Sequence, residues 1–482
     1  MRRLIVVVLA LLIAVPAAAA NHYILDGGTG DGTAWDNALD ALPSPLTRGD
    51  TYYVGDGSYV TYAFDDAENG VLVITIKKAT VADHGTATGW VDTYGDGQAV
   101  FAGPANFSTN YWVFDGNGTH TTPSDNTANY GFKIAADYGP VQDGVNVMDI
   151  DGDYVTIRYA HVFNTYNADD SPAPDNGNCV VGVMALGINH AKFQNNFFEN
   201  CGQDGFIFDG STYILFERNY VKEYGKLLTG TSACHGQTYR AWTNADNHVV
   251  RWNAWESNEG QSLINTSNGI NGFRFYGNVV LNKYGVVPLA GFNSSGGLFH
   301  DNSEVPEPGI ADLYIYNNTY VNVGGDYQGY ANYSMEAVGS ATYIYNELHY
   351  NVQSNSVNGT WSAYAYNSCG GGDNGICTGG GGNHQTDVAS TIFTDYAADT
   401  FTLASATTAG LNLAAQAWWS NGADSFFGTV DSAADMTGAT RGADDVWDRG
   451  AYEYSGAPPA GATTLGAGGS ATLGAGGTVT LQ

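Results

Sequence analysis

A short repeat dominates the middle of this 482-residue chain. Between about residue 155 and residue 350, alternating apolar residues precede an Asn, and another apolar residue follows that Asn by two positions. The repeated column contains Ala160, Asn196, Asn219, Asn253, Asn278 and Asn318, and a degenerate copy lies at 343–345. The shortest interval, from Asn196 to Asn219, represents the bare unit, and longer intervals carry an inserted loop.

Alternation with a period of two predicts strands with one buried face. The residues expected to point inward two positions after the column are Val162, Phe198, Val221, Trp255, Val280 and Tyr320. Glycines six or seven residues after the column predict a turn, and a third apolar stretch then closes each coil. Because one unit cannot bury its apolar face alone, the coils must stack. The sequence therefore predicts an all-β, single-stranded right-handed parallel β-helix with an Asn ladder at one corner.

The charge balance limits the partners of such a solenoid. Lys and Arg number 17 against 48 Asp and Glu, which gives a formal net charge of −31. A phosphate backbone would be repelled, so we expect no nucleic-acid partner. Hydrophobic residues make up 43% and charged residues 13% of the chain, so there is ample material for a folded core.

The N-terminus has the pattern of a secretory signal peptide. Arg2 and Arg3 precede an apolar run, and the small residues that end at Ala20 predict cleavage there, with residues 1–20 removed. The run is short for a membrane span, and the rest of the chain contains no candidate span, so we expect no membrane insertion after cleavage. The mature protein is expected to be secreted, periplasmic or held at the cell surface.

The two ends of the mature chain contain further motifs. At the start lie His22-Tyr-Ile-Leu-Asp-Gly-Gly28 and a segment that contains Trp35, and at the end lies Trp447-Asp-Arg-Gly-Ala-Tyr-Glu-Tyr454. These motifs resemble those of secreted bacterial proteins of the pectate-lyase-like β-helix superfamily, in which the Trp-containing segment forms a short capping helix and Ile is more often found at the position of Arg449. The resemblance implies one β-helix domain over residues 21–455, and it implies the fold more than a particular activity.

Residues 456–482 form a Gly/Ala/Thr-rich tail in which Thr-Leu-Gly-Ala-Gly-Gly recurs every eight residues. We expect a flexible or weakly β-forming segment, and self-association through it is one interpretation.

Five Cys residues remain in a compartment where disulfides persist. Cys369 and Cys377 bracket a Gly-rich loop and are expected to pair. Alignment of Gly205–Phe208 with Thr238–Ala241 also places Cys201 beside Cys234, which would suit a second disulfide.

The cations cluster in one part of the chain. Eight of the 15 that remain without Arg2 and Arg3 (17 − 2 = 15) lie between residues 192 and 283. In the enzymes that the sequence resembles, the outer face of the first strand of each coil and the loop before it form the polysaccharide groove. A β-elimination needs a base and a cation that neutralises a uronate carboxylate. The residues of suitable type are Lys222, Lys226, His235 and Arg240, and the expected substrate contacts at outward positions are Lys192, Arg251, Arg274 and Tyr276.

Three alternatives stay open at this point. Calcium is the other common neutraliser, and Asp204 and Asp209 flank the matching strand. A glycoside hydrolase would need two carboxylates whose spacing in space the sequence does not reveal. A non-catalytic carbohydrate-binding or structural β-helix needs neither. The preferred hypothesis is a secreted protein that acts on an extracellular anionic polysaccharide by β-elimination.

Overall fold

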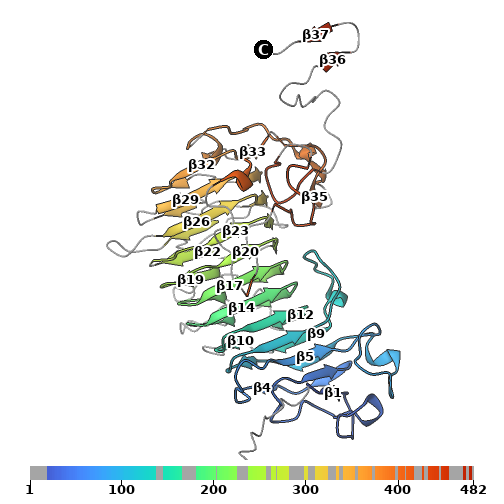
Figure 1. Cartoon of the computed structure of the whole chain (residues 1–482). Coiled ribbons are helices and arrows are strands. Elements are labelled where there is room, and N and C mark those ends of the chain that lie inside the picture. The colour runs from blue at the N-terminus through green and yellow to red at the C-terminus, as the bar shows by residue number, and fades with distance from the viewer. Residues whose placement is uncertain are drawn as a thin grey trace, which may run out of the picture.

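A computed structural model defines the fold, and Figure 1 shows its stacked coils from the blue N-terminal end to the orange C-terminal end. The residues that the structure describes are 19–136, 145–164, 181–201, 204–224, 237–256, 262–267, 269–281, 298–301, 310–323, 333–335, 340–352, 357–371, 375–380, 382–396, 400–407, 409–416, 426–427, 433–443, 447–454, 471–473 and 477–479. Residues 1–18, which belong to the predicted signal peptide 1–20, lie outside them.

Three parallel sheets form the walls of the solenoid. Sheet A contains β1 (Asn21–Ile24), β2 (Thr51–Val54), β5 (Ile74–Lys78), β8 (Trp112–Asp115), β11 (Val155–Arg158), β14 (Asn189–Gln194), β17 (Thr212–Glu217), β20 (Val249–Arg251), β23 (Arg274–Tyr276), β26 (Ala311–Tyr316), β29 (Ser340–Tyr345) and β32 (Ala363–Ala365). Sheet B contains β3 (Gly57–Tyr59), β6 (Ala99–Ala102), β9 (Phe132–Ala136), β12 (Ala160–Asn164), β15 (Phe197–Cys201), β18 (Tyr220–Tyr224), β21 (Ala254–Glu256), β24 (Val279–Leu281), β27 (Thr319–Val321), β30 (Leu348–Tyr350) and β33 (Ser368–Gly370). Sheet C contains β4 (Ala63–Phe64), β7 (Ala105–Phe107), β10 (Asn146–Ile150), β13 (Val181–Met184), β16 (Asp204–Ile207), β19 (Gln237–Trp242), β22 (Ser262–Ser267), β25 (Phe299–Asp301), β28 (Tyr333–Met335) and β31 (Val357–Asn358).

The chain visits the sheets in the order C, A, B, and each strand pairs with the equivalent strand of the next coil. The predicted right-handed parallel β-helix is confirmed. The pairing of Phe206 with Tyr239 and of Ile207 with Arg240 matches the register expected from the sequence. All six residues predicted to point inward after the Asn column belong to the central apolar core.

A ladder of buried Asn side chains holds the corner between sheets A and B. Asn219 Nδ2 donates to the Phe193 carbonyl at 2.9 Å and to Asn253 Oδ1 at 3.1 Å, and Asn253 repeats this pattern one coil later with Phe216 and Asn278. In the degenerate copy, Glu347 takes the ladder position and accepts from Asn318 Nδ2 at 3.1 Å. Each rung satisfies backbone groups that the sharp turn would otherwise leave unpaired in the core.

The N-terminal coil corrects one expectation. Instead of a short capping helix, the segment forms a single 3-10 turn, η1 (Trp35–Asn37). The Trp35 ring packs against the outward-pointing Tyr23 and against Trp90 and Tyr94, in a small apolar cluster separate from the central core. Its indole N–H donates to the His84 carbonyl at 2.9 Å. The other described 3-10 turns are η2 (Asp92–Tyr94), η3 (Thr127–Asn129), η5 (Gly375–Cys377), η6 (Ser390–Ile392) and η7 (Leu413–Ala415).

The segment after the last coil folds back over the outer face of sheet A. It includes the antiparallel pair β34 (Phe393–Asp395) and β35 (Thr400–Leu403), and its side chains form a second apolar cluster with Leu215, Val249 and Tyr316 of the sheet. We call residues 388–454 the C-terminal cover. In the tail, β36 (Ala471–Leu473) pairs with β37 (Gly477–Val479) as an antiparallel hairpin.

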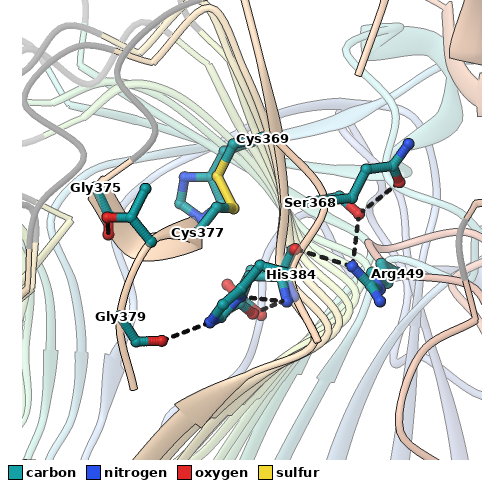
Figure 2. Close-up of a disulfide and its surroundings, with 12 residues drawn as sticks. Ser368, Cys369, Gly375, Cys377, Gly379, His384 and Arg449 are labelled. Atoms are coloured by element: carbon teal, nitrogen blue, oxygen red, sulfur yellow. Dashed lines mark hydrogen bonds between the residues drawn. A yellow bond between two sulfur atoms is a disulfide. The ribbon is translucent and has the colours of Figure 1, made fainter. Parts of the chain in front are cut away.

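Arg449 of the closing motif ties the C-terminal cover to the last coil (Figure 2). Its guanidinium donates to the carbonyls of Asn367, Asn383 and Ala409 at 2.8–2.9 Å and to Ser368 Oγ at 3.3 Å. Cys369, next to Ser368, forms a disulfide with Cys377. Arg449, at the position where Ile is more usual, therefore donates several hydrogen bonds at the end of the solenoid.

Candidate functional site

The outer face of sheet C presents a row of side chains, one from each coil. Strand register aligns Asp149, Met184, Ile207, Arg240, Asn265 and His300 along the solenoid axis. Neighbouring members are about 4.8 Å apart at the backbone, as in any sheet. Arg240 is the cation in this row among the described residues, and it occupies the outward position that the sequence predicts.

Two neighbours hold the Arg240 guanidinium in place. Arg240 Nε donates to both carboxylate oxygens of Asp209 at 3.1 Å, and Nη2 also donates to Asp209. The guanidinium carbon lies 4.1 Å from the ring centroid of Trp242. These contacts leave Nη1 without a partner among the described residues, and one fifth of the side chain is exposed. Arg240 is thus a fixed cation with one free donor edge, which can bind an anion.

Trp242 links this cation to the next coil. Its indole N–H donates to Asn265 Oδ1, and its backbone N–H donates to Asp209 Oδ1 at 3.2 Å. We call Asp209, Arg240, Trp242 and Asn265 the Arg240 surface. A half-buried aromatic ring beside a charged donor and an amide is a combination suited to a sugar ring with a carboxylate.

Lys222 lies on a different wall of the solenoid. It points outward from β18 of sheet B, and strand register places it between Glu199 of β15 and Glu256 of β21. Its ammonium is 3.9 Å from Glu199 Oε1, and about a quarter of each side chain is exposed. The structure therefore does not bring Lys222 and Arg240 onto one face. They lie on the two strands that the segment 225–236 connects.

Glu199 also accepts a hydrogen bond from the buried His161, whose Nε2 is 3.0 Å from Glu199 Oε2. Burial lowers the pKa of His161 below its ordinary value, although Glu199 acts in the opposite direction. Burial opposes ionisation of Glu199 too, but the hydrogen bond from His161 and the charge of Lys222 lower the pKa of this carboxyl on balance. The pair is therefore a neutral imidazole that donates to an ionised carboxylate.

Glu256 has an analogous donor. The Tyr220 hydroxyl, on the preceding coil, donates to Glu256 Oε2, and both residues are almost completely buried. Glu199 and Glu256 thus each accept a hydrogen bond from a residue on the preceding coil. That donor lies two positions before the residue that pairs with the Glu in the strand register. We call Glu199, Lys222 and Glu256 the sheet B row.

The sequence pattern did not predict a site role for four of these residues, Trp242, His161, Glu199 and Glu256. For the sheet B row a signal was available, because its three members each follow the Asn column by three positions. Reading that column across the repeats shows a charged residue in three successive coils. For the His161–Glu199 bond no signal existed, because it depends on side-chain geometry across coils.

Three expected substrate contacts lie on sheet A and are covered. Arg251, Arg274 and Tyr276 point outward as predicted, yet they are only 7%, 4% and 1% exposed. Arg251 donates to Glu217 Oε2 at 2.7 Å and to the Tyr276 hydroxyl at 2.9 Å. Because the C-terminal cover packs over this face, the three side chains contribute to packing and are not accessible to a polymer.

Lys192, the fourth expected contact, is on sheet A as well. Its ammonium lies 4.0 Å from the ring centroid of Phe426, a residue of the C-terminal cover. It therefore also belongs to the contact between the solenoid and the cover.

The two Asp residues considered for calcium are at opposite ends of β16. Asp204 is buried at its start and accepts from the Gln237 backbone N–H at 3.3 Å, whereas Asp209 follows its end and pairs with Arg240. The described residues contain no group of three or more His, Cys, Asp or Glu arranged to hold a metal ion. Asp209 is better described as the residue that positions Arg240.

Several expected residues cannot be placed. Lys226, His235 and Cys234 lie outside the described residues. Cys201 ends β15 in sheet B, and its backbone partner on the next coil is Tyr224, so its disulfide with Cys234 stays a prediction. No helix within the described ranges is long and apolar enough to cross a membrane.

No family model and no curated protein sequence matches the chain. Solved structures with a similar fold include pectate lyase Pel9A, with 14% identity, coverage of 79% of this chain and 84% of that one, and a TM-score of 0.35. The lacto-N-biosidase of family GH136 from Eubacterium ramulus has 11% identity, coverage of 77% and 68%, and a TM-score of 0.40. A PL6-family polysaccharide lyase from Pseudopedobacter saltans has 11% identity, coverage of 68% and 88%, and a TM-score of 0.28.

Proposed function

We propose that this right-handed parallel β-helix binds an extracellular anionic polysaccharide on the Arg240 surface and cleaves it by β-elimination. The observation that carries the proposal is the fixed guanidinium of Arg240 on the outer face of sheet C beside Trp242, whose Nη1 has no partner within the described part of the chain. In a chain with a net charge of −31, a preserved and oriented cation on an accessible face favours an anionic ligand.

In the proposed reaction, Arg240 Nη1 binds the carboxylate of a uronate residue. Neutralisation of that carboxylate makes the neighbouring C–H more acidic, and a base removes its proton. The C–H electron pair forms a carbon–carbon double bond while the bond to the glycosidic oxygen breaks, and that oxygen takes up a proton. The register neighbours of Arg240, Ile207 and Asn265, cannot act as this base at neutral pH. We assign the base to Lys226 or His235, which belong to the segment that leads directly into β19.

The test uses the secreted chain and a panel of uronate polymers, with ultraviolet absorbance of the unsaturated product as the signal. Arg240→Met should lower kcat/KM by about 10²-fold or more, because it removes a charge contact that strengthens in the transition state. The matched control is Arg158→Met, whose side chain is 42% exposed on sheet A. Equal activity in both variants, with folding verified by circular dichroism, would refute the role of Arg240.

A chelator decides whether calcium assists. Product formation that survives chelation supports neutralisation by Arg240 alone, whereas loss of product assigns part of that task to calcium at Asp204 or Asp209.

The alternative of a glycoside hydrolase has less support on sheet B. Glu199 is about a quarter exposed, but Glu256 is only 2% exposed and so does not face a polymer. Reducing ends without an absorbance change would nevertheless identify a hydrolase. Saturable binding with neither product would instead favour a non-catalytic carbohydrate-binding protein.

A further inference from the structure

The first described residues before β1 make contacts that bear on how the chain is processed. The Ala20 backbone N–H donates to Asp50 Oδ1 at 2.8 Å, and the Ala20 carbonyl accepts from the Thr51 backbone N–H at 2.9 Å. Ala20 thus extends the pairing of β1 with β2 by one residue. The expected cleavage after Ala20 would remove both bonds.

Asp50 is held firmly at this position. Its side chain is 10% exposed, and Oδ2 lies 2.9 Å from His22 Nε2, whose ring stacks on Tyr52 with centroids 4.6 Å apart. The Asp50 carbonyl accepts from the Thr75 backbone N–H at 3.1 Å, which fixes the main chain as well. A largely buried carboxylate is stabilised more by a charged donor than by a neutral one. In the uncleaved chain, the donor to Asp50 Oδ1 is the neutral main-chain amide of Ala20.

The sequence offers two equivalent cleavage positions. Small residues at the first and third positions before the cut are present for cleavage after Ala19, with Ala17 and Ala19, and for cleavage after Ala20, with Ala18 and Ala20. Only the first leaves Ala20 in the mature protein. It would also convert the nitrogen that faces Asp50 from a neutral amide into an α-ammonium.

We propose that the mature protein begins at Ala20 and that Asp50 is the receptor for its new amino terminus. The peptidase acts on the extended chain before it folds, so the folded structure does not determine the cleavage position. The structure instead indicates which product keeps the contacts of Ala20 with Asp50 and Thr51. The inference depends on removal of the leader and is independent of the reaction proposed for the Arg240 surface.

The direct test is N-terminal sequencing and intact mass of the protein secreted from the full-length chain. The expected first residue is Ala20. A first residue of Asn21 or Ala19, or a chain that retains Met1, would overturn the proposal.

A second experiment tests the receptor. Chains that begin at Ala20 and at Asn21 are released from a fusion partner, each with and without Asp50→Asn, and their thermal midpoints are compared at pH 6. The chain that begins at Ala20 should have the higher midpoint, and Asp50→Asn should reduce the difference to the share of the bond between the Ala20 carbonyl and the Thr51 N–H. Acetylation of the Ala20 amine, which removes its charge but keeps an N–H, should lower the midpoint. Equal midpoints for the two unmodified chains would contradict a receptor role for Asp50.

Discussion

Glu347 is the acidic member of an otherwise amide-based ladder. It is completely buried, and Tyr333 and Asn318 donate to its carboxyl oxygens. Burial raises the pKa of Glu347 to about 8, although these donors act in the opposite direction. At neutral pH the folded protein therefore keeps a proton that an exposed Glu would have lost.

This proton makes stability depend on pH. Between the ordinary pKa of Glu and about 8, the folded state binds more protons at Glu347 than the unfolded state, so the free energy of unfolding falls as pH rises. Glu347→Gln should remove this contribution while it preserves the length of the side chain. Denaturant midpoints measured from pH 5 to pH 8 should fall less steeply in the variant than in the parent. Parallel slopes would show that Glu347 does not hold the proton.

The alternation of residues along the strands predicted which way the side chains point. It did not predict which of them another part of the chain buries. Arg240, Arg251 and Arg274 all point outward as the alternation predicts, because side chains on a strand must alternate between faces. Only Arg240 is accessible, because the cover that buries the other two comes from residues more than 100 positions later in the chain. Local periodicity contains no information about such a distant contact.

At the scale of secondary-structure elements, the Asn ladder was the most predictable feature. An Asn at a fixed place in each repeat can both close a turn and bond to its copies above and below, and the hydrogen bonds of Asn196, Asn219 and Asn253 follow that pattern. The coils before residue 155 escaped detection as repeats. The strand register aligns Phe132 and Ala99 with the Asn column in these coils, so the column that marks the period is absent there.

The closing motif contains a second testable element. Arg449 is 1% exposed, and burial lowers the pKa of its guanidinium to about 10. Arg449→Met should destabilise the protein by about 3 kcal/mol, because one buried and two partly buried carbonyls lose their charged donor. Lys77→Met, which removes an ion pair with Asp83 in which both side chains are partly exposed, should cost less than about 1 kcal/mol. Chemical denaturation of both variants makes the comparison, and equal losses would contradict the role assigned to Arg449.

At the scale of the whole molecule, a strongly acidic protein is proposed to bind an acidic polymer. The net charge of −31 repels a polyuronate over a distance set by the Debye length, which shrinks from about 30 Å at 0.01 M salt to about 10 Å at 0.1 M. The association rate should therefore rise over this range, contrary to the usual behaviour of oppositely charged partners. Stopped-flow measurements with a labelled oligouronate test this, and a rate that falls with salt would point to a larger cationic surface than the Arg240 surface.

The C-terminal cover and the tail have different expected roles in the whole molecule. The cover buries aromatic residues of sheet A, such as Tyr276 and Tyr316, whose rings stack with centroids 4.5 Å apart. We propose that the tail, including the β36–β37 hairpin, serves self-association and leaves the stability of the solenoid unchanged.

The central claim is that Arg240 binds the carboxylate of a sugar. Titration calorimetry with an oligouronate and with its neutral, carboxyl-reduced counterpart tests it most directly. The account predicts that the parent protein prefers the acidic ligand, and that Arg240→Met removes this preference while Arg158→Met retains it. Equal affinity of the parent for the two ligands, or a preference that survives in Arg240→Met, would contradict the account.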